Sequence, residues 1–175
     1  MPEGPQDVEV RELRFEDDGS IPNNPTLPLL LYPQALTKEE QDPPRCKELL
    51  AGNGWGGSWV NGVFPYHHYH SASHEVLCVV EGEARIAFGG PSGEKIEVAA
   101  GDVVVVPAGV GHCRESSGSG FSVVGAYPKG QENYDLRTGE EDERPEVLKN
   151  IRNVPPPEAD PIFGEGGPLT ERWSG

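Results

Sequence analysis

The chain has 175 residues, the size of one ordinary domain, and carries 29 acidic against 14 basic side chains, a formal net charge of −15. A field of that sign repels the phosphate backbone of nucleic acids and anionic membrane surfaces, so we expect neither as a partner. The 23 glycines and 18 prolines, set between short apolar segments, favour brief strands joined by turns. The composition therefore predicts an all-β protein.

The first residues, MPEGPQDVEV, lack the basic and apolar regions of a secretory signal peptide, and no apolar run in the sequence is long enough to span a bilayer. The cysteines Cys46, Cys78 and Cys113 are odd in number and widely spaced, which fits free thiols better than a disulfide framework. We therefore expect a soluble protein in the cytoplasm.

The predicted elements of the first third are two short strands and a helix. Residues 8–15 alternate imperfectly, as an edge strand does, and LLLY at residues 29–32 predicts a second strand. The helix is predicted at residues 44–53, with Asp42 as its N-cap, prolines in its first turn and a glycine or asparagine at its end. Its two leucines are expected to pack on the sheet.

The rest of the chain divides at about Pro128. Residues 55–128 are alternating or apolar runs punctuated by Gly and Pro, a pattern typical of antiparallel hairpins in a sandwich or barrel. The polar remainder predicts a short helix at residues 145–152 and then an extended tail. Because the tail contains Ile162, Phe163, Leu169 and Trp173, we expect it to dock on the barrel.

Four of the five histidines and a glutamate fall within residues 67–75, HHYHSASHE. In an extended strand His68 and His70 point to the same side, and after the bend at SAS Glu75 can return a carboxylate toward them. The fifth histidine, His112, follows a valine run and a glycine-rich turn that can aim it at the same place. Three imidazoles and a carboxylate form, in outline, a site for a divalent transition metal.

The spacing of these residues resembles the two motifs of the cupin superfamily. The first motif, from glycine through His-x-His and glutamate to glycine, is matched at every interval by Gly62, His68, His70, Glu75 and Gly82. The second, from glycine through Pro-x-Gly to histidine, is matched by Gly101, Pro107, Gly109 and His112, with Ser116 in place of a final asparagine. That asparagine varies in the family and does not bind metal, so its loss concerns local packing.

The opening SIPNNPTLPLLLY and the tail PIFGEGGPL further resemble small single-domain microbial cupins whose reaction is mostly unassigned. The resemblance implies one domain over residues 1–175: a double-stranded β-helix (jelly-roll barrel) with its core at about 55–128, an N-terminal strand and helix at 8–53, and a tail at 129–175. It also implies a homodimer. The metal would be Fe, Mn, Ni, Co or Zn, with no other cofactor, and its ligands would be His68, His70, Glu75 and His112.

Other polar residues near the motifs have less certain roles. Tyr66 shares the parity of the histidine pair and is a candidate catalytic residue, but it could equally fill the barrel. His74 is a second catalytic candidate, or an outer-shell partner, an alternative ligand or a solvated neighbour. His67 has the wrong parity and suits a surface or dimer contact. Arg85 and Arg114 could anchor an anionic substrate, although surface ion pairs are their more common role.

Two classes of function fit this pattern. The first is a metal-dependent enzyme acting on a small oxygen-rich molecule as an isomerase, decarboxylase, cyclase or dioxygenase. The second is a non-catalytic cupin that binds a small ligand or the metal itself, and a purely structural barrel is a third alternative. An ionisable group within reach of the metal would favour the enzyme, whereas a barrel lined only by aliphatic residues would favour binding.

Overall fold

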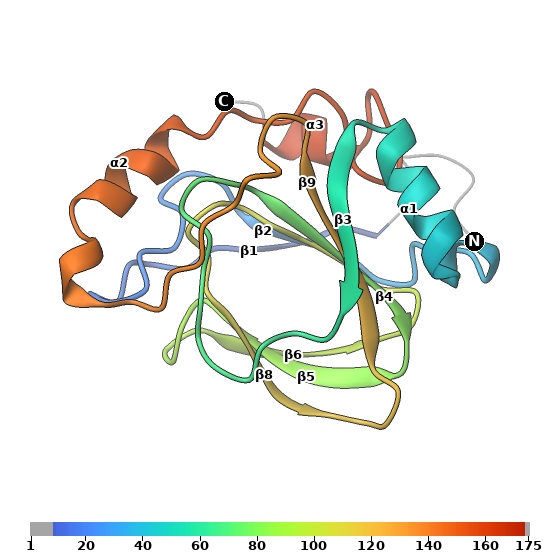
Figure 1. Ribbon diagram of the computed structural model, residues 1–175, viewed down its shortest axis with the longest axis horizontal. Coiled ribbons are helices and arrows are strands. Elements are labelled where there is room, and N and C mark those ends of the chain that lie inside the picture. Colours follow the sequence, from blue (N-terminus) through green and yellow to red (C-terminus); the bar gives the residue numbers. More distant parts are fainter. Residues whose placement is uncertain (1–8, 174–175) are drawn as a thin grey trace.

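The computed structural model describes residues 9–173, and the strands of this part form two antiparallel sheets packed face to face (Figure 1). The larger sheet has six strands in the order β1-β2-β7-β4-β9-β3, and the smaller has three in the order β6-β5-β8. This arrangement is the predicted all-β jelly roll. The first residue of the predicted edge strand, Val8, lies outside the described residues.

The strands and helices between residues 9 and 173 have the following bounds. The strands are β1 (Arg11–Leu13), β2 (Leu29–Tyr32), β3 (Trp55–Asn61), β4 (Glu75–Glu81), β5 (Glu83–Phe88), β6 (Glu94–Ala99), β7 (Val103–Val106), β8 (His112–Ser117) and β9 (Ser122–Pro128). The α-helices are α1 (Pro43–Gly52), α2 (Glu146–Asn153) and α3 (Pro168–Arg172), and two short 3-10 turns are η2 (Glu39–Gln41) and η3 (Glu141–Glu143). None of these helices is long and apolar enough to cross a membrane.

The larger sheet is buried on both faces, which explains why its central strands are apolar at almost every position. On β4, Leu77 packs between the two sheets, while its neighbour Cys78 belongs to a second core on the outer face. Their partners on β7 divide in the same way, because Leu77 pairs with Val104 and Cys78 with Val103. The inward side of β4 begins at Glu75, so this strand delivers a carboxylate to the space between the sheets.

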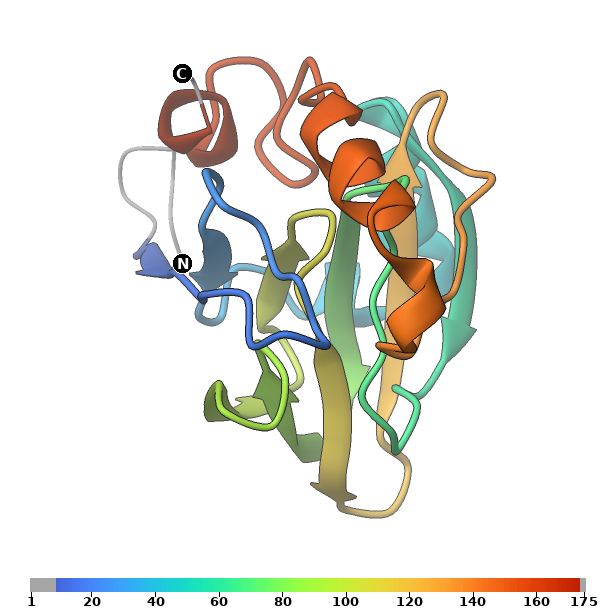
Figure 2. The same ribbon diagram turned by 90° about the vertical axis from the view of Figure 1, so that its left-hand side faces the viewer.

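Helix α1 and the C-terminal tail cover the outer face of the larger sheet (Figure 1), whereas Figure 2 looks at the side of the molecule on which α2 lies. The predicted start of α1 is confirmed, because the Asp42 carboxylate accepts a hydrogen bond from the backbone N–H of Arg45 and prolines occupy the first turn. As predicted, Leu50 is buried against the sheet.

The tail is held in place by one buried carboxylate, Asp160. Its Oδ2 accepts the hydroxyl of Tyr32 at 2.6 Å and the N–H of Leu169 at 3.0 Å. Its Oδ1 accepts the N–H groups of Ile162 and Phe163 at 2.8 and 3.0 Å. Each side-chain oxygen is therefore satisfied by donors from the tail or the sheet, and the predicted docking of the tail is confirmed.

One predicted strand is shorter than expected. The run at residues 57–70 lies in the segment 55–128 that the sequence predicts as strands and turns, but β3 ends at Asn61, and only single bridges follow, at His68 and Tyr69. Pro65 interrupts the loop and has no N–H for a ladder. The alternation still holds at its end, because Tyr69 points away from the histidines and donates its hydroxyl to Glu143 at 2.6 Å.

Candidate metal centre

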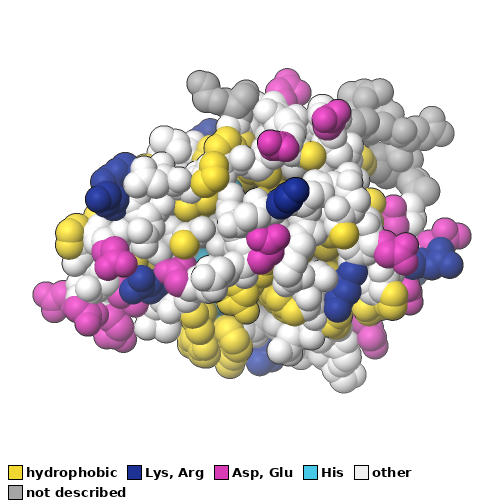
Figure 3. All heavy atoms as spheres, turned by 45° about the horizontal axis from the view of Figure 1, so that its top comes forward, with side chains coloured by type: hydrophobic (Ala, Val, Ile, Leu, Met, Phe, Trp, Pro, Cys, Tyr) yellow, Lys and Arg dark blue, Asp and Glu magenta, His cyan; other side chains and the backbone are white. Residues whose placement is uncertain are grey.

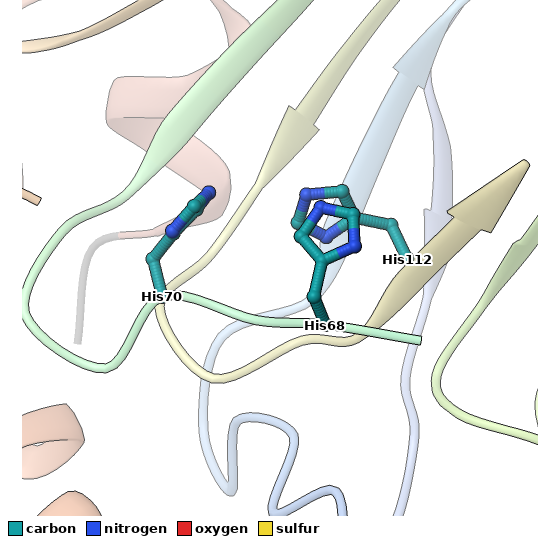
Figure 4. Close-up of side chains that lie close together, drawn as sticks. All are labelled: His68, His70 and His112. Atoms are coloured by element: carbon teal, nitrogen blue, oxygen red, sulfur yellow. The ribbon is translucent and has the colours of Figure 1, made fainter. Parts of the chain in front are cut away.

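His68, His70 and His112 meet at one end of the space between the sheets. One ring nitrogen from each lies within 4.8 Å of the other two, and all three side chains are buried. Figure 4 shows the rings projecting into a common space, two from the segment after β3 and one from the start of β8. The structure therefore brings together the three histidines that the sequence predicts as ligands.

Backbone pairing explains how residues 44 positions apart meet. His68 and His112 form an antiparallel bridge, with N–H to O distances of 3.2 and 2.9 Å in the two directions. The turn that precedes His112 is tied to the same segment, because the N–H of Gly109 donates to the carbonyl of His70 at 2.8 Å. Gly109 has φ +90°, and a Cβ there would stand 2.5 Å from the carbonyl oxygen of Asn23, so only glycine fits this turn.

Each imidazole is oriented by its Nδ1 atom. The Nδ1 of His68 lies 2.9 Å from the carbonyl oxygen of Tyr66, that of His70 lies 2.5 Å from the carbonyl of Asp135, and that of His112 lies 3.2 Å from the carbonyl of Val110. Since a carbonyl can only accept, Nδ1 carries the proton in every ring. In its neutral form each ring then presents a bare Nε2 lone pair, the form that a metal ion requires.

Glu75 places an oxygen beside these three nitrogens. Its side chain is 2% exposed, and Oε1 lies 3.5 Å from Nε2 of His70 and 3.2 Å from Nε2 of His112. This oxygen makes no hydrogen bond within the described part of the chain. Burial opposes its ionisation, but the facing histidines outweigh that effect and hold the pKa of Glu75 below its ordinary value.

A buried carboxylate oxygen facing bare imidazole nitrogens is stable only if a positive charge lies between them. Nitrogen and oxygen ligands about 2.1 Å from an ion and at right angles to each other are about 3.0 Å apart. The separations of 3.2 and 3.5 Å are close to this value. The three histidines therefore form a group that could hold a divalent metal ion, and the Glu75 carboxylate lies beside it.

The pKa values of two of the rings are shifted in opposite directions. It lowers the pKa of His68 to about 3, so this ring is neutral and ready to bind a cation at neutral pH. At His70 burial also acts to lower the pKa, but the Glu75 carboxylate outweighs it and the pKa is raised. His70 is therefore the ring on which the negative charge of Glu75 acts most directly, and a metal ion there would replace a proton.

The group opens into a cavity of about 200 Å³. Its other walls are mostly apolar or aromatic and come from β3, the loop after it, β4, β9 and the loop after β9. The side chains concerned are Trp59, Val60, Val63, Phe64, Leu77, Tyr127 and Tyr134, with Asn61 and Gly62 at the edge.

Comparison with known proteins agrees with this geometry. Residues 59–124, which span both motifs, match the family model for the cupin domain. The chain is also 47% identical over 165 residues to the uncharacterized protein YjlB of Bacillus subtilis (strain 168), covering 94% of this chain and 97% of that protein. The chain belongs to the cupin superfamily.

Solved cupin-like structures are more distant in sequence. The acireductone dioxygenase of Bacillus anthracis, with a cadmium ion in its active centre, is 18% identical with a TM-score of 0.40, and the match covers 70% of this chain and 79% of that one. An uncharacterized protein with a double-stranded β-helix domain from Klebsiella pneumoniae is 14% identical with a TM-score of 0.39, covering 80% and 85%.

The cavity of this cupin contains a titratable group that sequence reasoning missed, Tyr127 on β9. Its hydroxyl accepts the indole N–H of Trp59 at 2.8 Å, and burial, together with the nearby Glu75 carboxylate, raises its pKa above the usual range. Tyr127 is therefore a protonated donor at neutral pH. The alternation of β9 contained the signal, because Val123 faces inward and Tyr127 lies four residues later.

A second missed aromatic residue, Tyr134, lies in the loop after β9. Its ring stacks on that of Tyr127, with centroids 4.5 Å apart and an interplanar angle of 21°, and it meets the ring of His70 edge-on at 5.1 Å. The same loop holds the turn after His70, because the Asp135 carboxylate accepts the N–H and hydroxyl of Ser71 at 2.8 and 2.5 Å. This loop therefore forms one wall of the metal centre.

The two predicted catalytic residues lie in different places. Tyr66 is 42% exposed and does not line the cavity, but its ring stacks on that of Phe64, which does, with centroids 5.2 Å apart. His74 is fully buried outside the cavity, with its ring 4.8 Å from that of Trp173 and its Nδ1 accepting the N–H of Ala108 at 2.9 Å. Burial lowers the pKa of His74 to about 3, and its contacts favour a structural role.

Proposed function

We propose that this cupin is a metal-dependent enzyme acting on a small molecule, with His68, His70, His112 and Glu75 as ligands of one divalent transition metal. The observation that carries the proposal is the combination of three imidazoles locked by backbone carbonyls and one buried carboxylate oxygen with no hydrogen bond, 3.2 and 3.5 Å from two of them. Without a cation, such an arrangement of acceptors would be unfavourable.

Iron, manganese, nickel or cobalt, each able to take six ligands, would leave open positions and would supply a Lewis acid that polarises a substrate oxygen. Zinc with four protein ligands would be closed and would suit a structural site. The open site fits isomerase, decarboxylase, cyclase or dioxygenase chemistry.

The protein's own groups would bind and orient the substrate. The aromatic and aliphatic walls exclude water, which strengthens polar interactions within the cavity. The hydroxyl of Tyr127, protonated and beside Glu75, can donate a hydrogen bond to a substrate oxygen and stabilise negative charge that develops there. A non-catalytic binding barrel has no need of such a donor, so Tyr127 favours the enzyme over the binding module.

Metal analysis tests the ligand set. We would purify the wild-type protein without chelator or nickel affinity resin, alongside His70→Ala and Glu75→Gln, with His67→Ala as the matched control from the same segment. We expect near-stoichiometric iron, manganese, nickel or cobalt in the wild type and in His67→Ala, and loss of most of it in the other two. Absence of any transition metal from the wild type would overturn the proposal.

Catalysis needs its own experiment because the substrate is unknown. We would incubate the metal-loaded protein with a small-molecule extract of bacterial cells and follow the proton NMR spectrum over time. We expect particular signals to decay with the wild type, to persist with His70→Ala, and to decay more slowly with Tyr127→Phe, which keeps the metal. If the spectra with wild type and His70→Ala stay identical, the protein is a binding module and not an enzyme.

A further inference from the structure

Among the described residues that line the cavity, Glu75 is the only aspartate, glutamate, lysine or arginine. No lysine or arginine of the described part of the chain is therefore present there to receive an anion. Arg114, which the sequence suggested as an anchor for an anionic substrate, donates its Nε to the carbonyl of Val63 at 3.0 Å and an outer nitrogen to Ser117. Arg85, the other candidate, is paired with Glu97 outside the cavity.

A bound metal would change this balance by a limited amount. A divalent ion together with the Glu75 carboxylate leaves one net positive charge at the floor of the cavity. That charge suits a neutral ligand, or one that loses a single proton on binding. A dianion would be left with one uncompensated negative charge against apolar walls, because no lysine or arginine is found among the described residues that line the cavity.

The walls of the cavity are flat. The stacked pair Tyr127 and Tyr134 forms one wall, with His70 edge-on to both at centroid distances of 6.1 and 5.1 Å. Trp59 is hydrogen-bonded to the same pair through Tyr127, and Phe64 meets the ring of His68 edge-on at 5.2 Å. Aromatic faces and edges of this kind favour a planar ligand through offset-stacked and T-shaped contacts.

The mouth is apolar as well. Val60, Phe64 and Tyr134 are 41%, 46% and 43% exposed and all line the cavity. Figure 3 shows hydrophobic side chains gathered low on the face that it presents. Large apolar side chains left exposed around a cavity are typical of a site that takes an apolar ligand.

The size of the cavity limits the ligand to about one ring. A cavity of roughly 150 Å³ accommodates one benzene molecule. The volume here is about 200 Å³, which leaves room for one ring and a few substituents.

We propose that the cavity binds a small planar ring that carries no more than one negative charge. The planar shape follows from the aromatic walls, and the limit on charge follows from the lack of a lysine or arginine among the described residues that line the cavity. The limit of one charge rests on the proposed function, because a divalent ion beside Glu75 would leave one positive charge there.

Three probes separate these components, each titrated by ligand-observed NMR into the full chain as purified and without oxygen. Phenol and cyclohexanol differ in flatness, whereas phenol and phenyl phosphate, a dianion at mildly alkaline pH, differ in charge. We expect phenol to bind at least tenfold more tightly than either of the other two. Equal affinity for phenol and cyclohexanol would overturn the planar ring, and equal affinity for phenol and phenyl phosphate would overturn the limit on charge.

Two variants from one loop test the wall. Tyr134→Ala removes the stacked ring and should weaken phenol binding at least fivefold, while Leu136→Ala, which is also exposed but does not line the cavity, should leave it unchanged. Equal effects of the two variants would contradict the assigned wall. Val60→Arg adds a cation at the mouth and should improve phenyl phosphate binding at least fivefold, and no improvement would contradict the charge argument.

The outcomes also distinguish this inference from the proposed function. If metal analysis fails but phenol remains preferred over cyclohexanol, the planar ring stands and the proposed function falls. If the metal is present and phenol shows no preference over cyclohexanol, the metal centre stands and the planar ligand falls.

Discussion

The indole of Trp59 occupies the space that a side chain on Gly125 would need. These residues are register partners on β3 and β9, and a Cβ on Gly125 would stand 2.2 Å from Cζ2 of the indole. Glycine at this position lets the ring lie over the neighbouring strand and hydrogen-bond to Tyr127 at 2.8 Å. One missing methyl group therefore helps to shape a wall of the cavity.

Gly125→Ala should displace the indole, break its hydrogen bond and destabilise the protein by about 1–3 kcal/mol, the usual effect of overpacking a core. The matched control is Gly118→Ala, where the new Cβ would meet its nearest atom at an ordinary 3.5 Å. Urea unfolding and tryptophan fluorescence would measure both effects. The assigned contact would be wrong if the two variants unfolded at the same urea concentration with unchanged emission.

Asp135 positions His70 without touching the metal. Its carbonyl orients the ring of His70, and its carboxylate holds Ser71 and the N–H of Ala72 at 3.1 Å. Although burial opposes its ionisation, Arg137 and Ser71 keep the pKa of Asp135 below its ordinary value.

Asp135→Ala keeps the main-chain carbonyl that faces His70 but removes the carboxylate that holds this turn. It should therefore weaken metal affinity by up to about 10-fold, the lower end of the range found when outer partners of metal ligands are removed. The affinity would be measured by competition with a coloured chelator, with Asp142→Ala in the exposed turn as control. Circular dichroism would confirm that both variants are folded. Equal affinity in the two variants would argue against a positioning role for Asp135.

Glu143 should make stability depend on acidity. Burial would raise its pKa, but hydrogen bonds from Tyr69 at 2.6 Å, Thr138 at 3.1 Å and Gly139 at 3.0 Å outweigh it, so the pKa of the folded state is lowered. A group with a lowered folded pKa contributes stability above its unfolded value of about 4.3 and loses it as pH falls through the folded value.

Glu143→Gln should therefore cost about 1–2 kcal/mol at pH 7 and much less at pH 3. Chemical unfolding of both proteins across this range would measure the difference. A gap that stays constant down to pH 3 would show that ionisation of Glu143 is not involved. The exposed Glu141→Gln should show no gap at either pH.

Asp160→Asn should loosen the tail. Asparagine keeps one acceptor for Ile162 and Phe163, but its NH2 group would face the N–H of Leu169, leaving a buried donor unpaired. A loss of about 1–3 kcal/mol is expected. Limited proteolysis should cut the variant within the tail sooner than the wild type, and an unchanged rate of cleavage would contradict this account.

Much of the fold and of the metal centre could be predicted from the sequence, because both depend on short intervals. The alternating pattern predicted that His68 and His70 point to the same side. The valine run followed by a glycine-rich turn predicted that His112 lies close to them. The length of the strand within residues 57–70 was overestimated, because an alternating pattern does not show where a hydrogen-bonded ladder ends. Strand β3 ends at Asn61, ahead of Pro65.

The walls were harder to predict because they depend on long-range contacts. Tyr134 lies in a polar loop, and its position depends on hydrogen bonds to residues more than sixty positions earlier, such as Ser71. No local pattern reports such contacts. Tyr127 lies in a run that the sequence predicts as a strand, and the alternation of that strand, β9, could have placed its side chain in the cavity. The homodimer and the cytoplasmic location stay predictions.

The three histidine rings take their orientation from main-chain carbonyls, and a carbonyl is present whichever residue carries it. Substitutions in the surrounding walls can therefore accumulate during evolution without turning the rings. A lineage with this centre could exchange one ligand preference for another by altering residues such as Val60 or Tyr134, while the metal chemistry is inherited unchanged.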